Sequence, residues 1–146
     1  MIINLNETLI HKKQHTQWYV INAKQQNLGR LSSKIAYTLV GKNSKNYLPF
    51  QKNNIKIIVI NSKYVEVTGK KSKQKLYIRH SGRPGGLKKE VFNKLQNRMP
   101  NKIIEHSIRG MLPKNNLGRE LFKNLKIYSE NEHPHEAQQP IFLNIN

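Results

Sequence analysis

The stretch RGMLPKNNLGR, residues 109–119, carries the side chains best suited to chemistry in this sequence. Arg109, Lys114 and Arg119 place three cations around a proline and two glycines, between two segments with the spacing of amphipathic helices. A simple connection between helices needs Gly or Pro to end the first helix, but it does not need three cations. The pattern predicts either a solvated loop or a surface that binds phosphate groups.

Two other stretches combine cations with small residues. GKKSKQK at 69–75 lies between two predicted strands and is expected to be a loop that projects four lysines. RHSGRPGGLKK at 79–89 adds two arginines, two lysines and three glycines. Glycine lets the backbone approach a sugar-phosphate chain, lysine supplies a point charge, and arginine forks onto phosphate or stacks on a base. Both stretches predict contacts to nucleic acid, with a flexible solvated loop as the alternative.

Enzymatic function finds little support. VGKNSK at 40–45 and TGKKSK at 68–73 resemble the end of a phosphate-binding P-loop, but neither has the glycine five residues before the GK pair. Asp is absent and the eight Glu are scattered singly, so no close pair of carboxylates is available to hold Mg²⁺. We therefore predict that the chain is not an enzyme and uses no cofactor and no small-molecule substrate.

The histidines offer two further possibilities. His133 and His135 could belong to a metal site, but a closed zinc site needs two more ligands, and the chain has no cysteine. We favour a surface or tail-docking role for this pair and predict no metal. His80 follows Arg79 and precedes Arg83 closely, so it could hydrogen-bond a phosphate or a ribose.

The charge of the chain favours a polyanionic partner. Twenty-six Lys and Arg face eight acids, which gives a net charge of +18 and a pI near 10.3. Such an excess repels itself in the compact state, and nucleic acid is the usual partner that relieves the repulsion. Residues 70–126 carry +13 and residues 127–146 carry −3. The binding surface is therefore expected mainly in 70–126, while the tail is expected to pack on protein through Tyr128, Pro134, Pro140 and Phe142.

Membrane association is not expected. The opening MIINLNETLI has neither the pattern of a secretory signal nor the Arg- and Ser-rich character of a transit peptide. No stretch approaches the ~18 apolar residues of a membrane span. The cations are also not gathered on the polar face of one long amphipathic helix.

Hydrophobic spacing predicts an α/β order of elements in the first half of the chain. Residues 18–21 are typical of a buried strand, 28–40 of an amphipathic helix ended by Gly41, and 57–60 of a strand covered on both faces. Two further strands with one exposed face are expected at 65–67, and around Leu76 and Ile78, which alternate with Tyr77 and Arg79.

The second half has helical spacing from Phe92 onward, with breaks at Pro100 and Pro113. Met111 and Leu112 are expected in the core. A last short strand is expected at 126–128, followed by an irregular tail. This order predicts one α/β layered domain with a basic loop and arm.

Six segments, read together, resemble a known family: WYVINA at 18–23, LGRLSSKIA at 28–36, VTGKK at 67–71, GGLK at 85–88, RGMLPKNNLGR at 109–119 and YSENEHPHEAQQP at 128–140. Their order and spacing resemble the large-subunit ribosomal protein thirteen family, of bacterial or plastid type. The resemblance covers residues 17–143 as a single domain, with residues 1–16 as a variable arm. The family commonly has Asp where this chain has Asn22.

The resemblance implies a three-layer α/β/α domain around a small, mostly parallel sheet. It implies a structural constituent of the large ribosomal subunit that binds large-subunit ribosomal RNA, neighbours other ribosomal proteins and supports early assembly. Within the turn at 109–119, it implies that Gly110 and Gly118 let backbone and RNA come close. The predicted RNA-binding residues are Arg30, Lys42, Lys70, Lys71, Lys73, Arg79, His80, Arg83, Lys88, Arg109, Lys114, Arg119 and Lys123.

Two questions stay open at this point. The rival function is a free regulator that binds DNA or messenger RNA, although no helix-turn-helix or dimer zipper is recognisable. For the compartment, a composition rich in Lys, Asn and Ile, which AT-rich codons encode, favours the ribosome of a plastid stroma, with a bacterial cytoplasm as the alternative.

Overall fold

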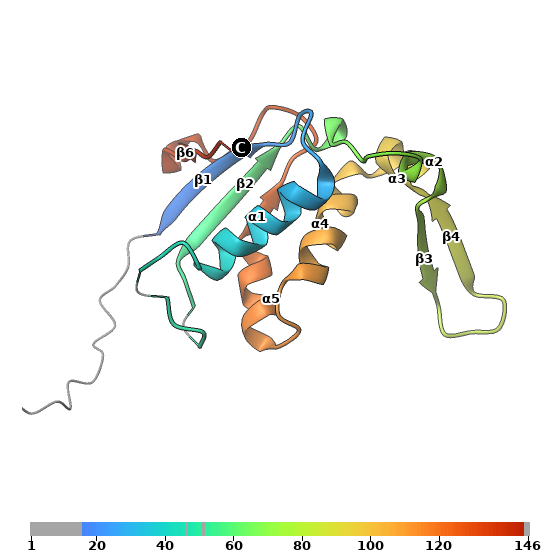
Figure 1. The fold of residues 1–146 in the computed structure, drawn as a ribbon, viewed down its shortest axis with the longest axis horizontal. Coiled ribbons are helices and arrows are strands. Elements are labelled where there is room, and N and C mark those ends of the chain that lie inside the picture. Colours follow the sequence, from blue (N-terminus) through green and yellow to red (C-terminus); the bar gives the residue numbers. More distant parts are fainter. Residues whose placement is uncertain (1–15, 46, 51, 145–146) are drawn as a thin grey trace, which may run out of the picture.

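A parallel sheet organises the chain, as Figure 1 shows for the computed structural model, which describes residues 16–45, 47–50 and 52–144. Its four strands lie in the order β5-β2-β1-β6, and every pairing between them is parallel. The α/β class and the parallel sheet are therefore confirmed. The strands are β1 (Gln17–Asn22), β2 (Ile55–Ile60), β5 (Leu125–Ile127) and β6 (Ile141–Phe142).

Strand β2 lies inside the sheet and is covered on both faces, as its continuous apolar run predicts. Ile57 and Val59 face the larger core cluster, whereas Ile58 and Ile60 face a smaller one on the opposite side. None of the four exceeds 3% exposure. Successive side chains of a strand point to opposite faces, so an unbroken apolar run requires a cover on each side.

Helices cover one face of the sheet. The helix α1 (Leu28–Val40) has the predicted bounds, and it ends where Gly41 adopts φ 80°, a left-handed conformation that glycine adopts without steric cost. The breaks expected at the two prolines are also confirmed, because Pro100 begins α4 and Pro113 follows its end. The longer helices that follow α1 are α3 (Phe92–Arg98), α4 (Pro100–Met111) and α5 (Asn116–Lys123).

The C-terminal tail covers the other face. Trp18 and Tyr128 pack against the smaller core cluster, and the ring of His135 lies 5.2 Å from that of Trp18. The Tyr128 hydroxyl and Nε2 of His135 are hydrogen-bonded at 2.8 Å. The third layer is thus the tail with its short 3-10 helix η2 (Glu136–Gln138), and His135 has the docking role that we favoured.

The tail is more regular and less buried than expected. Residues 141–142 pair with β1 as strand β6, in a segment where no strand was expected. Phe142 is 71% exposed and Pro134 is exposed as well, so the prediction that these two residues pack on protein is wrong. A two-residue edge strand buries little, because it has a neighbour on one side alone.

One strand prediction and one loop prediction need correction. Residues 65–67 form no strand and make a single bridge, from Glu66 to Asn27, although Val65 is buried in the core. The lysine-rich stretch at 69–75 is not an open loop, because Lys71–Gln74 form the short helix α2. In both segments the side-chain pattern correctly predicted which residues are exposed. It did not predict the backbone hydrogen bonding, because that depends on which other segment lies beside the chain.

A hairpin projects from the layered body at the far end from β6 (Figure 1). It consists of β3 (Leu76–His80) and β4 (Leu87–Val91), paired antiparallel. Leu76 and Ile78 are 49% and 61% exposed, whereas Tyr77 packs against Phe92 and His106. The expected strand is confirmed, but its apolar residues face solvent because little of the body lies beside the ribbon.

A charged pair fastens the base of the hairpin to α3. Arg98 donates from Nη2 to Oε2 of Glu90 at 2.5 Å and from Nε to Oε1 at 3.2 Å. This hydrogen bonding lowers the pKa of the Glu90 carboxyl. The two contacts form a forked arrangement that joins the end of β4 to α3.

The N-terminal boundary stays a prediction. The proposed arm at 1–16 lies, except for its last residue, outside the described residues. At the start of the domain, Oδ1 of Asn22 accepts from the backbone of Lys24 at 2.9 Å and from Nδ2 of Asn61 at 3.1 Å. The side-chain amide of Asn22 therefore supplies the acceptor that this turn uses.

Neighbouring residues at the end of α4 give a test of the core. Leu112 is 4% exposed and belongs to the larger cluster, whereas Met111 is 46% exposed, contrary to expectation. We expect Leu112→Ala to lower the free energy of unfolding by about 2–5 kcal/mol, because it leaves a cavity. Met111→Ala is the control, with a loss below about 1 kcal/mol. Equal losses in urea denaturation would contradict this packing.

Candidate nucleic-acid interface

The turn between α4 and α5 is shaped by backbone hydrogen bonding and by proline. The N–H of Leu112 bonds to the carbonyl of Ile108 and closes α4, and Pro113 cannot continue the helix. Asn115 then caps α5, because its Oδ1 accepts from the N–H of Gly118 at 2.9 Å. These local signals hold the segment 112–115 in a defined conformation between the two helices.

Gly118 has a different role from the one expected. It is buried, and a Cβ at this position would lie 1.8 Å from the carbonyl oxygen of Pro113. The glycine therefore lets the turn fold back onto α5, and the prediction that it brings RNA close to the backbone is wrong. Gly110 is exposed, and a Cβ added there would meet no neighbouring atom of the described residues within 4 Å.

A groove of about 440 Å³ opens between the end of α4, the turn and α5. Four cations line it, all of them predicted RNA-binding residues, and all four are exposed. The other lining residues are apolar or small. The cations are Arg109, Lys114, Arg119 and Lys123, and the remainder are Leu112, Pro113, Gly118 and Phe122.

Among the residues that the structure describes, no acid lines this groove. The acid that is nearest in sequence, Glu120, pairs with Lys52 at 3.0 Å. The hydrogen bond from Lys52 lowers the pKa of the Glu120 carboxyl, and the charge of Lys123 contributes less. Within the described ranges, the other ion pairs join Lys63 to Glu130 and Arg98 to Glu90. The four groove cations therefore repel one another, and the described lining offers them no compensating acid.

The hairpin carries a second group of predicted residues. Arg79 lies directly opposite Lys88 in the antiparallel register, and both side chains are exposed. Like charges placed opposite each other destabilise a strand pair, so this arrangement suits an anion that bridges them. His80 uses Nδ1 to accept from the N–H of Gly82 at 2.9 Å, which shapes the turn towards Arg83.

The other predicted residues lie apart from these two groups. Lys70, Lys71 and Lys73 are exposed on and before α2, which packs near the base of the hairpin. Arg30 is in the first turn of α1 and Lys42 follows its end, so the length of that helix separates them. All thirteen predicted residues are exposed, but the structure gathers four of them in the groove and four on the hairpin.

Phe122 is the lining residue that the sequence prediction missed. It lies three residues after Arg119 and one before Lys123, which places all three on adjoining parts of one helix face. Cζ of Arg109 stands 5.1 Å from the centroid of its ring. The spacing of Arg119, Phe122 and Lys123 could have been recognised in the sequence. The contact of Arg109 with Phe122 could not, because Arg109 lies on another helix.

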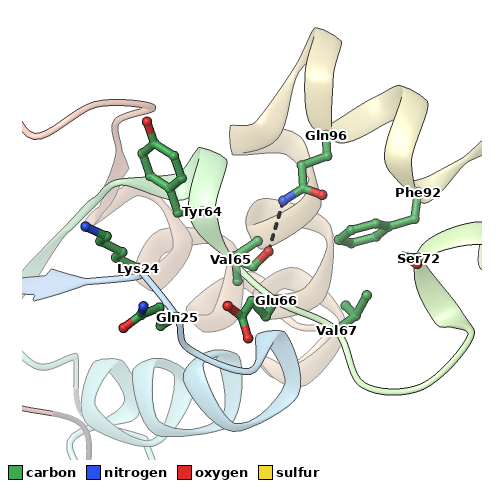
Figure 2. Close-up of a pocket in the computed structure, with 9 residues that line it drawn as sticks. All are labelled: Lys24, Gln25, Tyr64, Val65, Glu66, Val67, Ser72, Phe92 and Gln96. Carbon is green, nitrogen blue, oxygen red and sulfur yellow. Dashed lines mark hydrogen bonds between the residues drawn. The ribbon is translucent and has the colours of Figure 1, made fainter.

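A second hollow, of about 550 Å³, lies beside α3 and is shown in Figure 2. Nε2 of Gln96 donates to the carbonyl oxygens of Val65 and Lys63, both at 2.9 Å, and ties α3 to the segment before α2. Lys24 and Glu66 line this hollow with opposite charges. The two charges offset each other, and none of the thirteen predicted RNA-binding residues lines this hollow. The hollow therefore has no particular preference for a polyanion.

Catalytic and metal chemistry gain no support from the described part of the chain. Across 16–45, 47–50 and 52–144, no three His, Asp or Glu side chains gather as a metal site would need. His133 and His135 have ring centroids 6.4 Å apart, and His135 is engaged by Trp18 and Tyr128. The helices described there include none that is long and apolar enough to cross a bilayer.

A parallel α/β fold with a cationic groove and a cationic hairpin defines a class of small basic proteins suited to a polyanionic partner. The family model described as Ribosomal protein L13 matches residues 16–134. The chain belongs to this family, so it is a ribosomal protein of the large subunit and not an enzyme.

Its relatives are similar over most of their length. "Large ribosomal subunit protein uL13c" of Gracilaria tenuistipitata var. liui is 58% identical over 137 residues, covering 93% of this chain and 96% of the relative. "Large ribosomal subunit protein uL13" of Gloeothece citriformis (strain PCC 7424) is 58% identical over 130 residues, covering 89% and 86%. The protein of the same name from Thermosynechococcus vestitus has the same identity and coverage.

The two glycines of the turn provide a matched test of its geometry. Gly118→Ala should destabilise the fold by about 1–3 kcal/mol, because the new Cβ meets the Pro113 carbonyl and the backbone must shift. Gly110→Ala, in the last turn of α4 with open space around it, should instead be neutral or stabilise by up to about 1 kcal/mol. Urea unfolding of both variants measures the difference in stability. An unchanged free energy of unfolding in Gly118→Ala would refute the close approach of Gly118 to the Pro113 carbonyl.

Proposed function

We propose that this chain binds large-subunit ribosomal RNA and, as a structural constituent, supports early assembly of the large subunit. The observation that carries the proposal is the groove between α4 and α5, where four exposed cations meet and no acid is found among the described lining residues. Phosphate contacts position a protein on nucleic acid and provide most of its salt-dependent affinity. A structural role needs no more chemistry than this.

The hairpin supplies a second, separate RNA contact. Arg79, Arg83 and Lys88 lie on a ribbon that extends from the body, at a distance from the groove along the fold (Figure 1). Two contact regions on one rigid domain hold two RNA segments in a fixed relative position, which is how a protein stabilises a folded RNA. The exposed Leu76 and Ile78 on the same ribbon suit a neighbouring ribosomal protein.

For the compartment we propose the plastid stroma. The red algal relative with a plastid-type name is matched over 96% of its own length, which supports this choice. The AT-biased composition agrees with it. Cyanobacterial relatives are equally similar, so a bacterial cytoplasm is the alternative.

The electrostatic part of the proposal can be tested with charge-matched variants. In one variant Arg109, Lys114 and Arg119 become Gln; in the control, Lys24, Lys94 and Lys102, exposed cations outside the predicted set, become Gln. Both lose three charges. We expect only the first to weaken binding to large-subunit ribosomal RNA strongly and to reduce the slope of log affinity against log salt, by up to about three phosphate equivalents.

Circular dichroism should show both variants folded, because removing mutually repulsive charges costs little stability. Equal effects of the two variants on affinity and salt slope would mean that net charge alone governs binding, and the groove assignment would fail.

Co-sedimentation tests the rival function, a free regulator that binds DNA or messenger RNA. The wild-type chain should stay with large subunits through a moderate-salt wash, whereas a regulator would be released.

A further inference from the structure

The groove between α4 and α5 has an apolar wall that phosphate binding does not require. Leu112, Pro113 and Phe122 make up this wall beside the four cations. Phosphate oxygens are held by cations and N–H donors, and lysines on an open surface suffice for that. Through Phe122 the apolar wall instead holds the guanidinium of Arg109, and a guanidinium plane is a surface on which a nucleobase stacks.

Arg109 places a planar cation beside the aromatic ring of this groove. Its Cζ lies 5.1 Å from the Phe122 ring centroid, which is a cation–π contact between two helices. Phe122 is half-buried and packs against the main core, whereas Arg109 is exposed. The ring therefore contacts the guanidinium on one side and leaves Arg109 accessible from solvent.

The distance within this pair decides where a base fits. A ring inserted between the guanidinium and Phe122 needs about 7 Å, twice the optimal separation of two carbon atoms. The 5.1 Å observed leaves no such space. Room for a base is therefore left only on the side of the Arg109 guanidinium that faces away from Phe122.

We propose that the groove takes one unpaired RNA nucleotide, with its base stacked on Arg109 and its flanking phosphates held by Lys114, Arg119 and Lys123. This inference rests on the proposed RNA-binding function and specifies the form of RNA. The groove volume of about 440 Å³ lies within the range of small-ligand sites. Loops and bulges supply unstacked bases of this kind, and stacking accepts any base because each has a π face.

The experiment uses the full chain and three RNA hairpins that share one stem. The first has a single bulged adenosine, the second has an abasic site at the bulge, and the third is fully paired. Fluorescence anisotropy measures the three dissociation constants at several salt concentrations. The bulged RNA should bind about 5- to 150-fold more tightly than the abasic one, the range that stacking of one base provides.

Two conservative variants locate the stack. Arg109→Lys keeps the charge but removes the planar guanidinium, so the preference for the base should disappear while the salt slope stays the same. Arg119→Lys is the control in the same groove and should keep the preference. Phe122→Leu keeps an apolar side chain in the core contact but removes the ring, and should reduce the preference with a similar melting temperature.

The outcomes separate this inference from the function beneath it. If the wild-type chain binds bulged and abasic RNA equally, with a steep salt dependence, the groove holds phosphate alone and the stacking proposal is overturned. Loss of the preference in Arg119→Lys but not in Arg109→Lys overturns it as well. If the wild-type chain binds the RNAs no better than its variant with Gln at 109, 114 and 119, the groove is not the contact and this inference fails with it; if it binds neither these RNAs nor large-subunit ribosomal RNA, the proposed RNA-binding function also fails.

Discussion

Strand β2 must be buried on both faces, and the layers of the fold are arranged to meet this requirement. Ile57 and Val59 require the helical layer, and Ile58 and Ile60 require the tail, so neither cover is dispensable. The same strand pairs with β1 and β5, which brings the start and the end of the domain together. Asn101 joins the helical layer to this arrangement by donating from Nδ2 to the carbonyl of Ile127 in β5. The position of α4, and with it the groove, follows from this packing.

Charge acts against this core, and its placement shows how the two are reconciled. The chain carries +18, yet the buried positions are almost entirely apolar, so the repulsion is confined to the surface. The ion pairs within the described ranges are at least partly exposed and contribute little to stability. Glu120 and Glu90 are engaged by Lys52 and Arg98, away from the groove lining. Positive charge is thereby concentrated where a polyanion has access.

The two cationic regions differ in shape for reasons that lie in the backbone. The turn before α5 is fixed by the cap at Asn115 and by contact between Gly118 and Pro113, so its cations are displayed on a defined concave surface. The hairpin is supported at its base by the pair of Glu90 with Arg98 and extends from the body. A concave, preorganised groove is suited to one nucleotide, whereas an extended ribbon is suited to a longer stretch of RNA backbone.

Features that depend on local order along the chain could be predicted before the fold was known. The period of Leu28 to Leu39 with Gly41 predicted α1 to the residue, the apolar run at 57–60 predicted the central strand, and composition predicted a cationic surface in 70–126. The family motifs led to the ribosomal class for the same reason. Which side of an element is covered, in contrast, depends on how the elements pack. Met111 and Ile78 are exposed and Gly118 is buried because of what lies opposite them. Arg109 meets Phe122 across two helices, a contact that spacing within either helix does not contain.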